Sequence, residues 1–325
     1  MGDDDNAARH PPGAAQRARG LRATPLAARR HNSPLVHYAD PCWSFAFKRD
    51  PLASVTVTAE TGVREPELSC LIATTPWSGS QLLCQALRAT RLVGDPRDYF
   101  NPFEVVTYSV EWRLLRPGHN HLPRYPEQEF ARRYLAAVTK AAMGPGGVLS
   151  VNLPWSHQRW LARFARAAAP DVPGTPTRSD AAVVEQWFPR TRYLYLTSGD
   201  RVRQAARWYR GQRRGPATAA GAPHPDFQEI RWIETLISRQ EKAWVSYFQV
   251  HRIDAYRIEY EDFLTHPEET VGGILSWLGV PGSPARPWRN EARRRRLAVP
   301  VDWLPDYVAA RDRLSPTIGV YQGQG

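Results

Sequence analysis

The sequence predicts an α/β fold with a central parallel sheet and a P-loop-like strand-loop-helix unit. Two observations lead to this prediction: short apolar runs alternate with amphipathic helical segments, and the run SCLIATT leads directly into a loop rich in Ser and Gly. Strands joined by helices require crossover connections, so the sheet is parallel and ligands are expected at the carboxyl ends of its strands. A chain of 325 residues can bury a large core, and we expect one domain over 36–325.

Four strand-helix units are expected in chain order. SCLIATT precedes SGSQLLCQALRAT, in which Leu82, Leu83 and Leu87 have helical spacing. The remaining units are GVLSVNL with HQRWLARFARAAA, TRYLYLT with DRVRQAARWYRGQ, and YRIEY with PEETVGGILSWLG. Each strand is a compact apolar run, which is typical of a strand buried on both faces of a sheet.

The other segments are predicted from composition and periodicity. Residues 1–35 are rich in Ala, Arg, Pro and Gly, which predicts a disordered extension. The helix expected over 227–250 carries a core-facing stripe of Trp232, Leu236 and Trp244. The further expectations are a short edge strand in SVTVTAETG, a loop-rich region over 95–128, surface loops at 170–180 and 214–226, the second covering the site, and a last short helix in VDWLPDYVAARD.

The formal charge of +11 favours an anionic partner, because a positive field concentrates negative ligands. Only three of the 43 basic residues are lysines, so part of the arginine content reflects coding bias. The run Arg293 to Arg296 is expected to be solvated. A second cluster is expected on the helix that faces the anion site, and it consists of Arg190, Arg192, Arg201, Arg203, Arg207, Arg210, Arg213 and Arg214.

Cysteine usage and hydropathy indicate an intracellular chain. Cys42, Cys70 and Cys84 have no metal-ligand spacing and cannot all pair with one another, so we expect reduced thiols and no metal site. No apolar run approaches the roughly 20 residues of a membrane span. We therefore expect a cytoplasmic protein without membrane contact.

The stretch TTPWSGSQLLC is the first candidate site. A strand that runs through such a loop into a helix places backbone N–H groups at a helix N-terminus, where the helix dipole favours an anion. Gly79 allows close approach of the backbone, and the hydroxyls of Ser78 and Ser80 can donate hydrogen bonds. The alternative is a helix capped by serine after a buried strand, with no ligand.

This loop resembles the 5′-phosphosulfate-binding loop of sulfotransferases, most closely that of the bacterial trehalose-sulfotransferase family, whose pattern is T-P-R-S-G-S/T-T-L-L-C. The departures are Trp77 and Gln81. Three further segments are similar to family motifs in the same order: GDPRDYF to G-x-P-x-E-Y-F, YLTSGDRVRQAARWYR to a segment with R-x-D-x-x-x-Q-A-x-S, and IEYEDFLTHPEETVGGILSWLGV to Y-E-D-L-x-x-D-P with its later F-L-G. The resemblance covers most of the chain from Leu71 to Val280 and implies a sulfotransferase fold.

The resemblance also implies a donor, 3′-phosphoadenosine 5′-phosphosulfate, and roles for particular residues. Asp98 occupies the position of the family's proposed base, where the shorter side chain reduces reach, and a plain turn carboxylate is the alternative. The donor's 5′ end would lie on the loop residues Trp77, Ser78, Gly79, Ser80 and Gln81. Ser198 and Arg207 would hold its 3′-phosphate, although the family has Arg at the first position and Ser at the second.

Three departures from the pattern, one of them an exchange between two positions, concern charge. Trp77 replaces the family's loop arginine, and an indole has one N–H donor and no charge. It either fills the core or stacks on a planar ligand. The Arg and Ser of the 3′-phosphate segment have exchanged positions, so one guanidinium and one hydroxyl remain. Asn152 stands where the family often has lysine.

The predicted function is transfer of a sulfuryl group from 3′-phosphoadenosine 5′-phosphosulfate to a hydroxyl of a small-molecule acceptor, a sugar or a secondary metabolite. No metal is expected, and a homodimer is expected by analogy with the family. The alternative is an enzyme on the same fold that has lost this donor and catalyses another reaction. Nucleic-acid binding is disfavoured because the aromatic residues lie in predicted core elements. The resemblance makes Glu259, Glu261 and Asp262 structural, and we expect His119, His121 and His157 to be solvated or structural.

Overall fold

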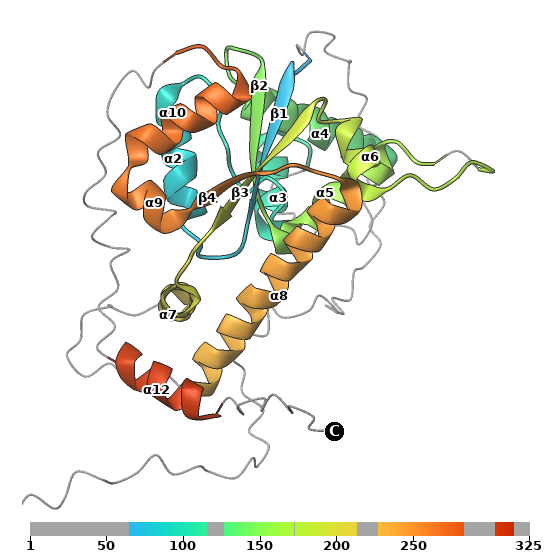
Figure 1. Ribbon diagram of the computed structural model, residues 1–325. Coiled ribbons are helices and arrows are strands. Elements are labelled where there is room, and N and C mark those ends of the chain that lie inside the picture. Colours follow the sequence, from blue (N-terminus) through green and yellow to red (C-terminus); the bar gives the residue numbers. More distant parts are fainter. Residues whose placement is uncertain (1–64, 116–126, 172, 213–226, 283–302, 315–325) are drawn as a thin grey trace, which may run out of the picture.

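The structure, a computed structural model, describes residues 65–115, 127–171, 173–212, 227–282 and 303–314. Within these ranges four strands form one parallel sheet in the order β2-β1-β3-β4 (Figure 1). They are β1 (Leu68–Thr74), β2 (Val148–Pro154), β3 (Thr191–Thr197) and β4 (Tyr256–Glu259). In the central strand, Leu71 pairs with Val151 on one side and with Tyr193 on the other. The central parallel sheet predicted from sequence is confirmed.

Helices connect and cover these strands. They are α2 (Ser80–Thr90), α3 (Pro102–Glu111), α4 (Gln128–Ala142), α5 (Trp155–Ala168), α6 (Asp180–Glu185), α7 (Arg201–Gln212), α8 (Phe227–His251), α9 (Tyr260–Thr265), α10 (Pro267–Leu278) and α12 (Leu304–Leu314). The predicted long helix and the predicted last helix correspond to α8 and α12. All four predicted strands are also present, although the last one ends at Glu259 because Tyr260 begins α9.

Alternate residues of β1, β2 and β3 enter two different cores. Helices cover both faces of the sheet (Figure 1). Leu71 and Ala73 of β1 pack with apolar residues of α3, α4, α5, α6 and α8. Cys70 and Ile72, which point the other way, pack with α2, α9 and α10. Cys70 and Cys84 are both buried free thiols, as predicted for these two, and burial raises the pKa of Cys70 to about 12. The sheet is therefore covered on both faces, and its strand ends remain as the place for a site.

A third core forms where α7, α8 and α12 meet beyond the sheet (Figure 1). Trp208 and Ile233 are fully buried in it, and Trp232 and Leu236 pack against it while only partly buried. Trp244 lies farther along α8 in the main core and donates a hydrogen bond from Nε1 to the carbonyl of Thr74, at 2.8 Å. The apolar stripe of α8 is therefore core, as predicted, and it also fixes the end of β1.

The region 95–128, predicted to be rich in loops, contains a helix instead. Asn101 caps α3 by accepting a hydrogen bond from the backbone N–H of Phe103 at 3.1 Å, and Pro102 occupies the first turn. Glu104 in the same turn favours the helix dipole. The loop prediction was therefore wrong for Pro102–Glu111, where the cap and the proline mark the start of a helix. The helices α4 and α6 were not predicted.

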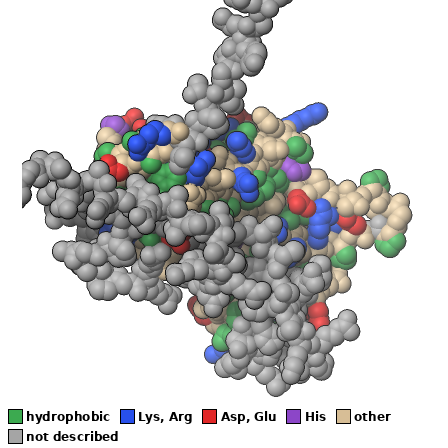
Figure 2. All heavy atoms as spheres, turned by 90° about the horizontal axis from the view of Figure 1, so that it is seen from below, with side chains coloured by type: hydrophobic (Ala, Val, Ile, Leu, Met, Phe, Trp, Pro, Cys, Tyr) green, Lys and Arg blue, Asp and Glu red, His purple; other side chains and the backbone are tan. Residues whose placement is uncertain are grey.

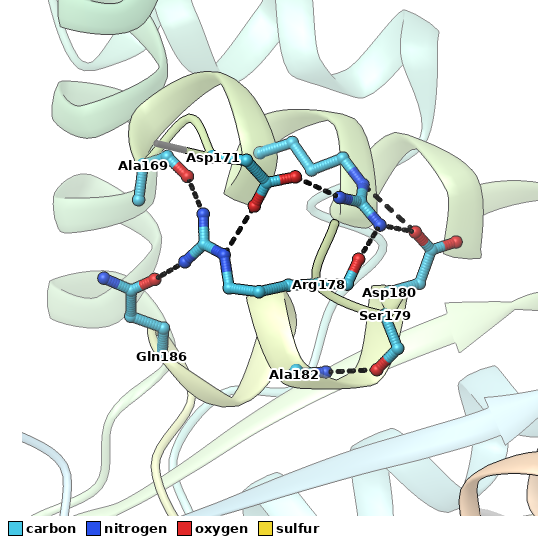
Figure 3. A network of polar contacts seen from close by, with 8 residues as sticks. Ala169, Asp171, Arg178, Ser179, Asp180, Ala182 and Gln186 are labelled. Carbon is cyan, nitrogen blue, oxygen red and sulfur yellow. Dashed lines mark hydrogen bonds and ion pairs between the residues drawn. The ribbon is translucent and has the colours of Figure 1, made fainter. Parts of the chain in front are cut away.

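The connection between α5 and α6 is a surface loop, as predicted, up to the cap residue Ser179. Figure 3 shows how arginine and aspartate side chains hold it. Arg166 of α5 pairs with Asp180 at 2.8 Å, and Arg178 pairs with Asp171 at 2.6 Å. Each pair is partly exposed, so each contributes at most about 1 kcal/mol. This network lies at the α5-α6 corner and orders the loop there.

Several predicted features lie outside the described residues. They are the extension 1–35, the strand in SVTVTAETG, the loop 214–226, the run Arg293 to Arg296, Cys42, His119 and His121. The division of the chain into an extension and one domain over 36–325 likewise stays a prediction.

Candidate active site

The loop between β1 and α2 has the geometry of an anion-holding turn. Thr75 and Ser78 are buried, and the N–H of Ser78 donates to the carbonyl of Thr75 at 3.3 Å. Gly79 caps α2 in the left-handed region at φ 93°, and its carbonyl accepts from Leu82 N at 2.9 Å. The hydroxyl oxygen of Ser78 is buried without a hydrogen-bond partner among the described residues. A buried hydroxyl beside a helix N-terminus can donate to an anion held there.

Tyr260 of α9 packs directly on this loop. A Cβ at residue 79 would lie 2.1 Å from two carbons of the Tyr260 ring, which is far inside any real contact. The positive φ of Gly79 is a second reason that only glycine fits. The close approach brings the end of β4 against the loop after β1.

Trp77 is neither a core residue nor a source of charge. Its φ is 63°, and its side chain is 41% exposed. The indole lies over Gly211 of α7, where an added Cβ would be 1.8 Å from the ring atom Cη2. The core-filling alternative is therefore wrong, and the aromatic face remains in part open to solvent.

Gln204 of α7 braces the backbone of the same loop. Its Nε2 donates to Thr75 Oγ1 at 2.8 Å and to the carbonyl of Pro76 at 2.7 Å. Gln204 is completely buried. The sequence analysis gave this residue no role, and the signal for it was the Q-A pair of the family segment. The loop therefore depends on α7 for its shape as well as on α2.

Asp98 lies beside the loop through a shared contact with Asn152 of β2. The Nδ2 of Asn152 donates to Asp98 Oδ1 and to Ser80 Oγ, the latter at 3.4 Å. The backbone N–H of Asn152 also donates to the carbonyl of Arg97 at 3.1 Å, which fixes the segment of Asp98 along the edge of β2. One amide side chain thus connects the predicted base and the predicted donor loop.

The electrostatic environment of Asp98 favours its protonated form. Burial raises its pKa to about 6, the hydrogen bond from Asn152 lowers it, and the charge of Glu104 on α3 raises it. A carboxyl group with a pKa near neutrality can both accept and release a proton at physiological pH. This is the behaviour of a candidate general base, and a carboxylate in an exposed turn would lack it.

Asp95 shapes the turn that carries Asp98. It forms ion pairs with Arg88 of α2 and with Arg97, the latter at 2.8 Å. Its carbonyl accepts a hydrogen bond from Tyr99 Oη at 2.9 Å. The segment is therefore attached to α2 as well as to β2, and its position does not depend on Asn152 alone.

Arg207 and Ser198, the pair that exchanged positions, are in contact. Arg207 Nη2 donates to Ser198 Oγ at 3.3 Å, and its Nε donates to the carbonyl of Trp77 at 3.4 Å. The guanidinium lies 4.9 Å from the centre of the Tyr260 ring. Burial lowers the pKa of Arg207, and the nearby Tyr260 and Glu261 oppose that change. Since the two residues touch, an exchange between them keeps one guanidinium and one hydroxyl in the same place.

Glu261 also lies in the candidate site, although the sequence analysis gave it only a structural role. Its Oε1 accepts from Ser198 Oγ at 2.7 Å, and its Oε2 accepts from the backbone N–H of Gly199 at 2.9 Å. A contact across 63 residues has no signal in local spacing. The carboxylate is bound by the group expected to hold the donor's 3′-phosphate.

Three other arginines of the predicted cluster have partners outside the loop. Arg201 pairs with Glu241 at 2.6 Å, Arg203 pairs with Asp200 at 3.1 Å, and Arg192 donates to the carbonyl of Trp277. Arg213 and Arg214 lie outside the described residues. Figure 2, seen from below, shows Lys and Arg side chains mixed with Asp and Glu on the described surface. The expectation that the whole cluster faces the site was wrong for Arg192, which lies at the opposite end of β3.

His157 is buried rather than solvated. It lies near the start of α5 with 6% exposure, and burial lowers its pKa to about 4. A neutral buried imidazole at this position fits the structural role expected of it.

Among the described helices, none is long and apolar enough to cross a membrane.

The fold and this site together define a class of protein. A parallel sheet with a loop and helix N-terminus at one strand end, and a carboxyl of raised pKa beside it, suits the transfer of a charged group. A family model described as Stf0 sulphotransferase matches residues 69–309. The chain belongs to this family and is a sulfotransferase-like transferase, which confirms the resemblance found in its motifs.

Two relatives and two solved structures are similar to this chain. It is 25% identical over 221 residues to "Trehalose 2-sulfotransferase" of Mycolicibacterium smegmatis, covering 62% of this chain and 80% of the relative. It is also 25% identical over 269 residues to "Trehalose 2-sulfotransferase" of Mycobacterium tuberculosis, covering 75% and 96%. A sulfotransferase domain from the curacin biosynthetic pathway is similar at 15% identity and a TM-score of 0.42, covering 69% of this chain and 80% of that one. A sulfotransferase domain of the Synechococcus PCC 7002 olefin synthase is similar at 12% identity and a TM-score of 0.41, covering 77% of this chain and 95% of that one.

Proposed function

We propose that this protein transfers a sulfuryl group from 3′-phosphoadenosine 5′-phosphosulfate to a hydroxyl of a small molecule. Membership of the family supports sulfuryl transfer in general, and the donor and acceptor are the proposal. The observation that carries it is the Asn152 side chain, which touches both Asp98 and Ser80. The shared contact supports the proposal that Asp98 acts as a base on a group held by the loop.

Asp98 is the proposed general base. The acceptor oxygen forms a bond to sulfur, the bond between sulfur and the donor's phosphate oxygen breaks, and the hydroxyl proton passes to the Asp98 carboxylate. With a pKa of about 6, Asp98 is mostly ionised at neutral pH and is still basic enough to take that proton. Asn152 acts as a positioning residue, because its amide holds the carboxylate in reach of the loop.

The loop is proposed to hold the 5′ end of the donor. Trp77, Ser78, Gly79, Ser80 and Gln81 surround the start of α2, and the buried Ser78 hydroxyl fits a donor oxygen. Because Trp77 adds no charge, positive charge near the loop comes from Arg207, which contacts the carbonyl of residue 77. Arg207 and Ser198 are proposed to face the 3′-phosphate.

The acceptor is proposed to be a sugar or a secondary metabolite. Trehalose is the first compound to test, because both curated relatives are trehalose 2-sulfotransferases by name. By analogy with the family we also propose a homodimer and a cytoplasmic location.

The direct test is sulfuryl transfer from donor labelled with ³⁵S in the sulfonate group. The purified protein is incubated with trehalose, other disaccharides and phenols, and labelled products are separated from the donor. We expect a labelled product that requires both the acceptor and the folded enzyme. Binding of 3′-phosphoadenosine 5′-phosphate without transfer to any hydroxyl would restrict the proposal to the donor, and absence of both would contradict it.

A second candidate is a transferase of this fold that no longer uses this donor. One observation favours it: Trp77 supplies no charge to the loop. Calorimetry with 3′-phosphoadenosine 5′-phosphate separates the two functions. A ligand that binds only the folded state at about 100 times its dissociation constant adds roughly 2.7 kcal/mol of stability, so a thermal shift also detects it.

A further inference from the structure

Trp77 presents an apolar ring to solvent from the proposed donor loop itself. Among the tryptophans of the described residues it is the exposed one, at 41%, whereas Trp208 and Trp244 are fully buried in the cores. Its backbone has a φ of 63°, a region that bulky side chains rarely adopt. Strained residues of this kind are concentrated at functional sites, which indicates a binding role for the ring.

The backbone of α7 fixes the position of the indole. A Cβ added at Gly211 would lie 1.8 Å from Cη2, 2.2 Å from Cζ2 and 2.6 Å from Cζ3 of Trp77. These three atoms form the outer edge of the six-membered ring, so this edge rests on the helix at the one residue without a side chain. A ring held in this way is preorganised, because a ligand that stacks on it does not have to order a loose side chain.

The side chain of Trp77 extends away from the corner proposed for the 3′-phosphate. Its backbone carbonyl accepts a hydrogen bond from Arg207 Nε at 3.4 Å, and its ring contacts Gly211, one turn farther along α7. Ser198 precedes the start of α7 at Arg201, from which Gly211 lies about 15 Å along the helix axis. A ligand that meets the indole at this end of the loop is therefore the acceptor.

The ring and the proposed base border the same short loop. Asp98 is connected through Asn152 to Ser80, which follows Trp77 by three residues. Burial raises the pKa of Asp98 to about 6. A phenol has a pKa of about 10, whereas an aliphatic hydroxyl is close to water at about 16. A base of this strength removes the proton of a phenol more readily than that of an alcohol.

We infer that Trp77 is a specificity-determining residue whose indole stacks on the ring of a phenolic acceptor. The inference rests on the proposed function, because it names the acceptor of the same reaction. The phenol oxygen forms a bond to sulfur, the bond between sulfur and the 5′-phosphate oxygen breaks with its electron pair left on that oxygen, and the phenolic proton passes to Asp98. The products are an aryl sulfate and 3′-phosphoadenosine 5′-phosphate.

The experiment compares acceptors of similar size. The compound para-cresol has a ring and an acidic hydroxyl, para-methylbenzyl alcohol has the ring with an aliphatic hydroxyl, and methylcyclohexanol has neither. Transfer from ³⁵S-labelled donor is measured as kcat and KM for the wild type and four variants: Trp77→Ala, Trp77→Phe, Gly211→Ala and Gly272→Ala. Trp77→Phe keeps an aromatic ring, and Gly211→Ala displaces the indole without removing it. Gly272→Ala is the matched control, a methyl added to α10 with nothing within 4 Å.

We expect Trp77→Ala and Gly211→Ala to raise KM for both ring compounds about tenfold and to leave that of methylcyclohexanol unchanged. Trp77→Phe should recover most of this loss, and Gly272→Ala should behave as the wild type. An equal loss for methylcyclohexanol, or an equal loss of affinity for 3′-phosphoadenosine 5′-phosphate, overturns the inference, because the indole would then shape the loop or contact the nucleotide. Should Gly211→Ala not fold, the two Trp77 variants decide.

The same measurements separate this inference from the proposed function. If the wild type sulfates trehalose and neither ring compound, the proposed function stands and the inference fails. If it sulfates no acceptor, NMR line broadening of para-cresol on the protein with 3′-phosphoadenosine 5′-phosphate decides. Broadening that is lost in Trp77→Ala and kept in Trp77→Phe supports the aromatic site although the proposed reaction fails. No broadening, or equal broadening in all three proteins, overturns the inference.

Discussion

The two ends of the proposed donor site differ in how far the chain satisfies their polar groups. At the loop end, the Ser78 hydroxyl is buried without a partner among the described residues, and Asp98 has a raised pKa. At the α7 end, Ser198 and Gly199 donate to Glu261, and Arg207 contacts both Ser198 and Tyr260. The loop end therefore has an unused hydrogen-bonding group, the Ser78 hydroxyl, whereas the α7 end already binds the Glu261 carboxylate.

This difference separates what is preorganised from what must rearrange. A ligand at the loop end gains hydrogen bonds without breaking any that the structure shows, so none of its binding free energy is needed to break existing contacts. A ligand at the α7 end must first displace a carboxylate from two donors. The chemistry of the family needs the loop end and the base, so those are the parts whose substitution should have the largest effects.

Substitution of the base should have the largest effect on activity. Asp98→Asn keeps the hydrogen bond from Asn152 but cannot accept a proton, so we expect the transfer rate to fall about 10²- to 10⁴-fold. In the wild type, kcat/KM should rise with pH through about 6 as Asp98 ionises, and the variant should lose this rise. The measurement is kcat/KM over about pH 5 to 8.

Glu104→Gln is the control for this pH profile. The Glu104 charge raises the pKa of Asp98, so its removal should move the inflection to lower pH and keep the activity.

The stability of Asp98→Asn gives an independent check on the pKa of Asp98. The folded pKa of Asp98 lies above the ordinary 3.8, so ionisation between about 3.8 and 6 destabilises the folded state, and Asp98→Asn should be more stable at neutral pH by at most about 3 kcal/mol. If Asp98→Asn retains full activity, Asp98 is not the general base.

Adding a methyl group at residue 79, between the loop and Tyr260, should have the largest effect on stability. Gly79→Ala adds a methyl 2.1 Å from the ring and requires a positive φ, so we expect a loss of about 3 kcal/mol or more in the free energy of unfolding, measured in urea. Gly174→Ala is the matched control. It has φ 85° with nothing within 4 Å, so only the backbone strain of about 1 kcal/mol should remain. Equal losses at the two positions would contradict the close contact with Tyr260.

The sheet and the loop end could be predicted from the sequence because their signals are local. Each strand is a short apolar run, and the loop after β1 has its Ser and Gly residues in sequence. The helix α3 was missed although its signal is local too, since Asn101 and Pro102 resemble a turn as much as a helix start. Local patterns therefore gave the elements, with errors where one pattern has two structural meanings.

The α7 end could be predicted only in part, because its contacts join distant residues. Ser198 and Arg207 were identified by position in a motif, but the carboxylate on Ser198 comes from 63 residues away. Asn152 and Asp98 are 54 residues apart. The motif comparison identifies Glu261 as the Glu of Y-E-D, and only the tertiary structure shows that its carboxylate contacts Ser198 and Gly199. The sequence predicts which residue types are present and leaves their pairing to the tertiary structure.

Arg207 tests whether the α7 end contributes to nucleotide binding at all. Arg207→Ala removes a buried charge in contact with Ser198 and the loop carbonyl, so we expect bisphosphate affinity to fall about tenfold or more. The free energy of unfolding should fall by about 1–3 kcal/mol. Arg203→Ala is the control on the preceding turn of α7, where the exposed pair with Asp200 contributes less than about 1 kcal/mol. If the two variants bind the nucleotide equally well, the loop end acts alone.

Trp77 should give the smallest effect and the sharpest comparison between the two ends. Trp77→Arg places a guanidinium on a loop that now has none, so we expect nucleotide affinity to rise by up to about tenfold. Trp77→Ala has the same backbone requirement at φ 63° and loses the same packing on Gly211, so any gain confined to Arg is due to charge. A gain shows that the loop end still has the shape for a phosphosulfate and lacks only charge. Weaker binding with both substitutions would mean that the exposed indole itself contacts the ligand, and the loop would then be a stacking surface as well as an anion site.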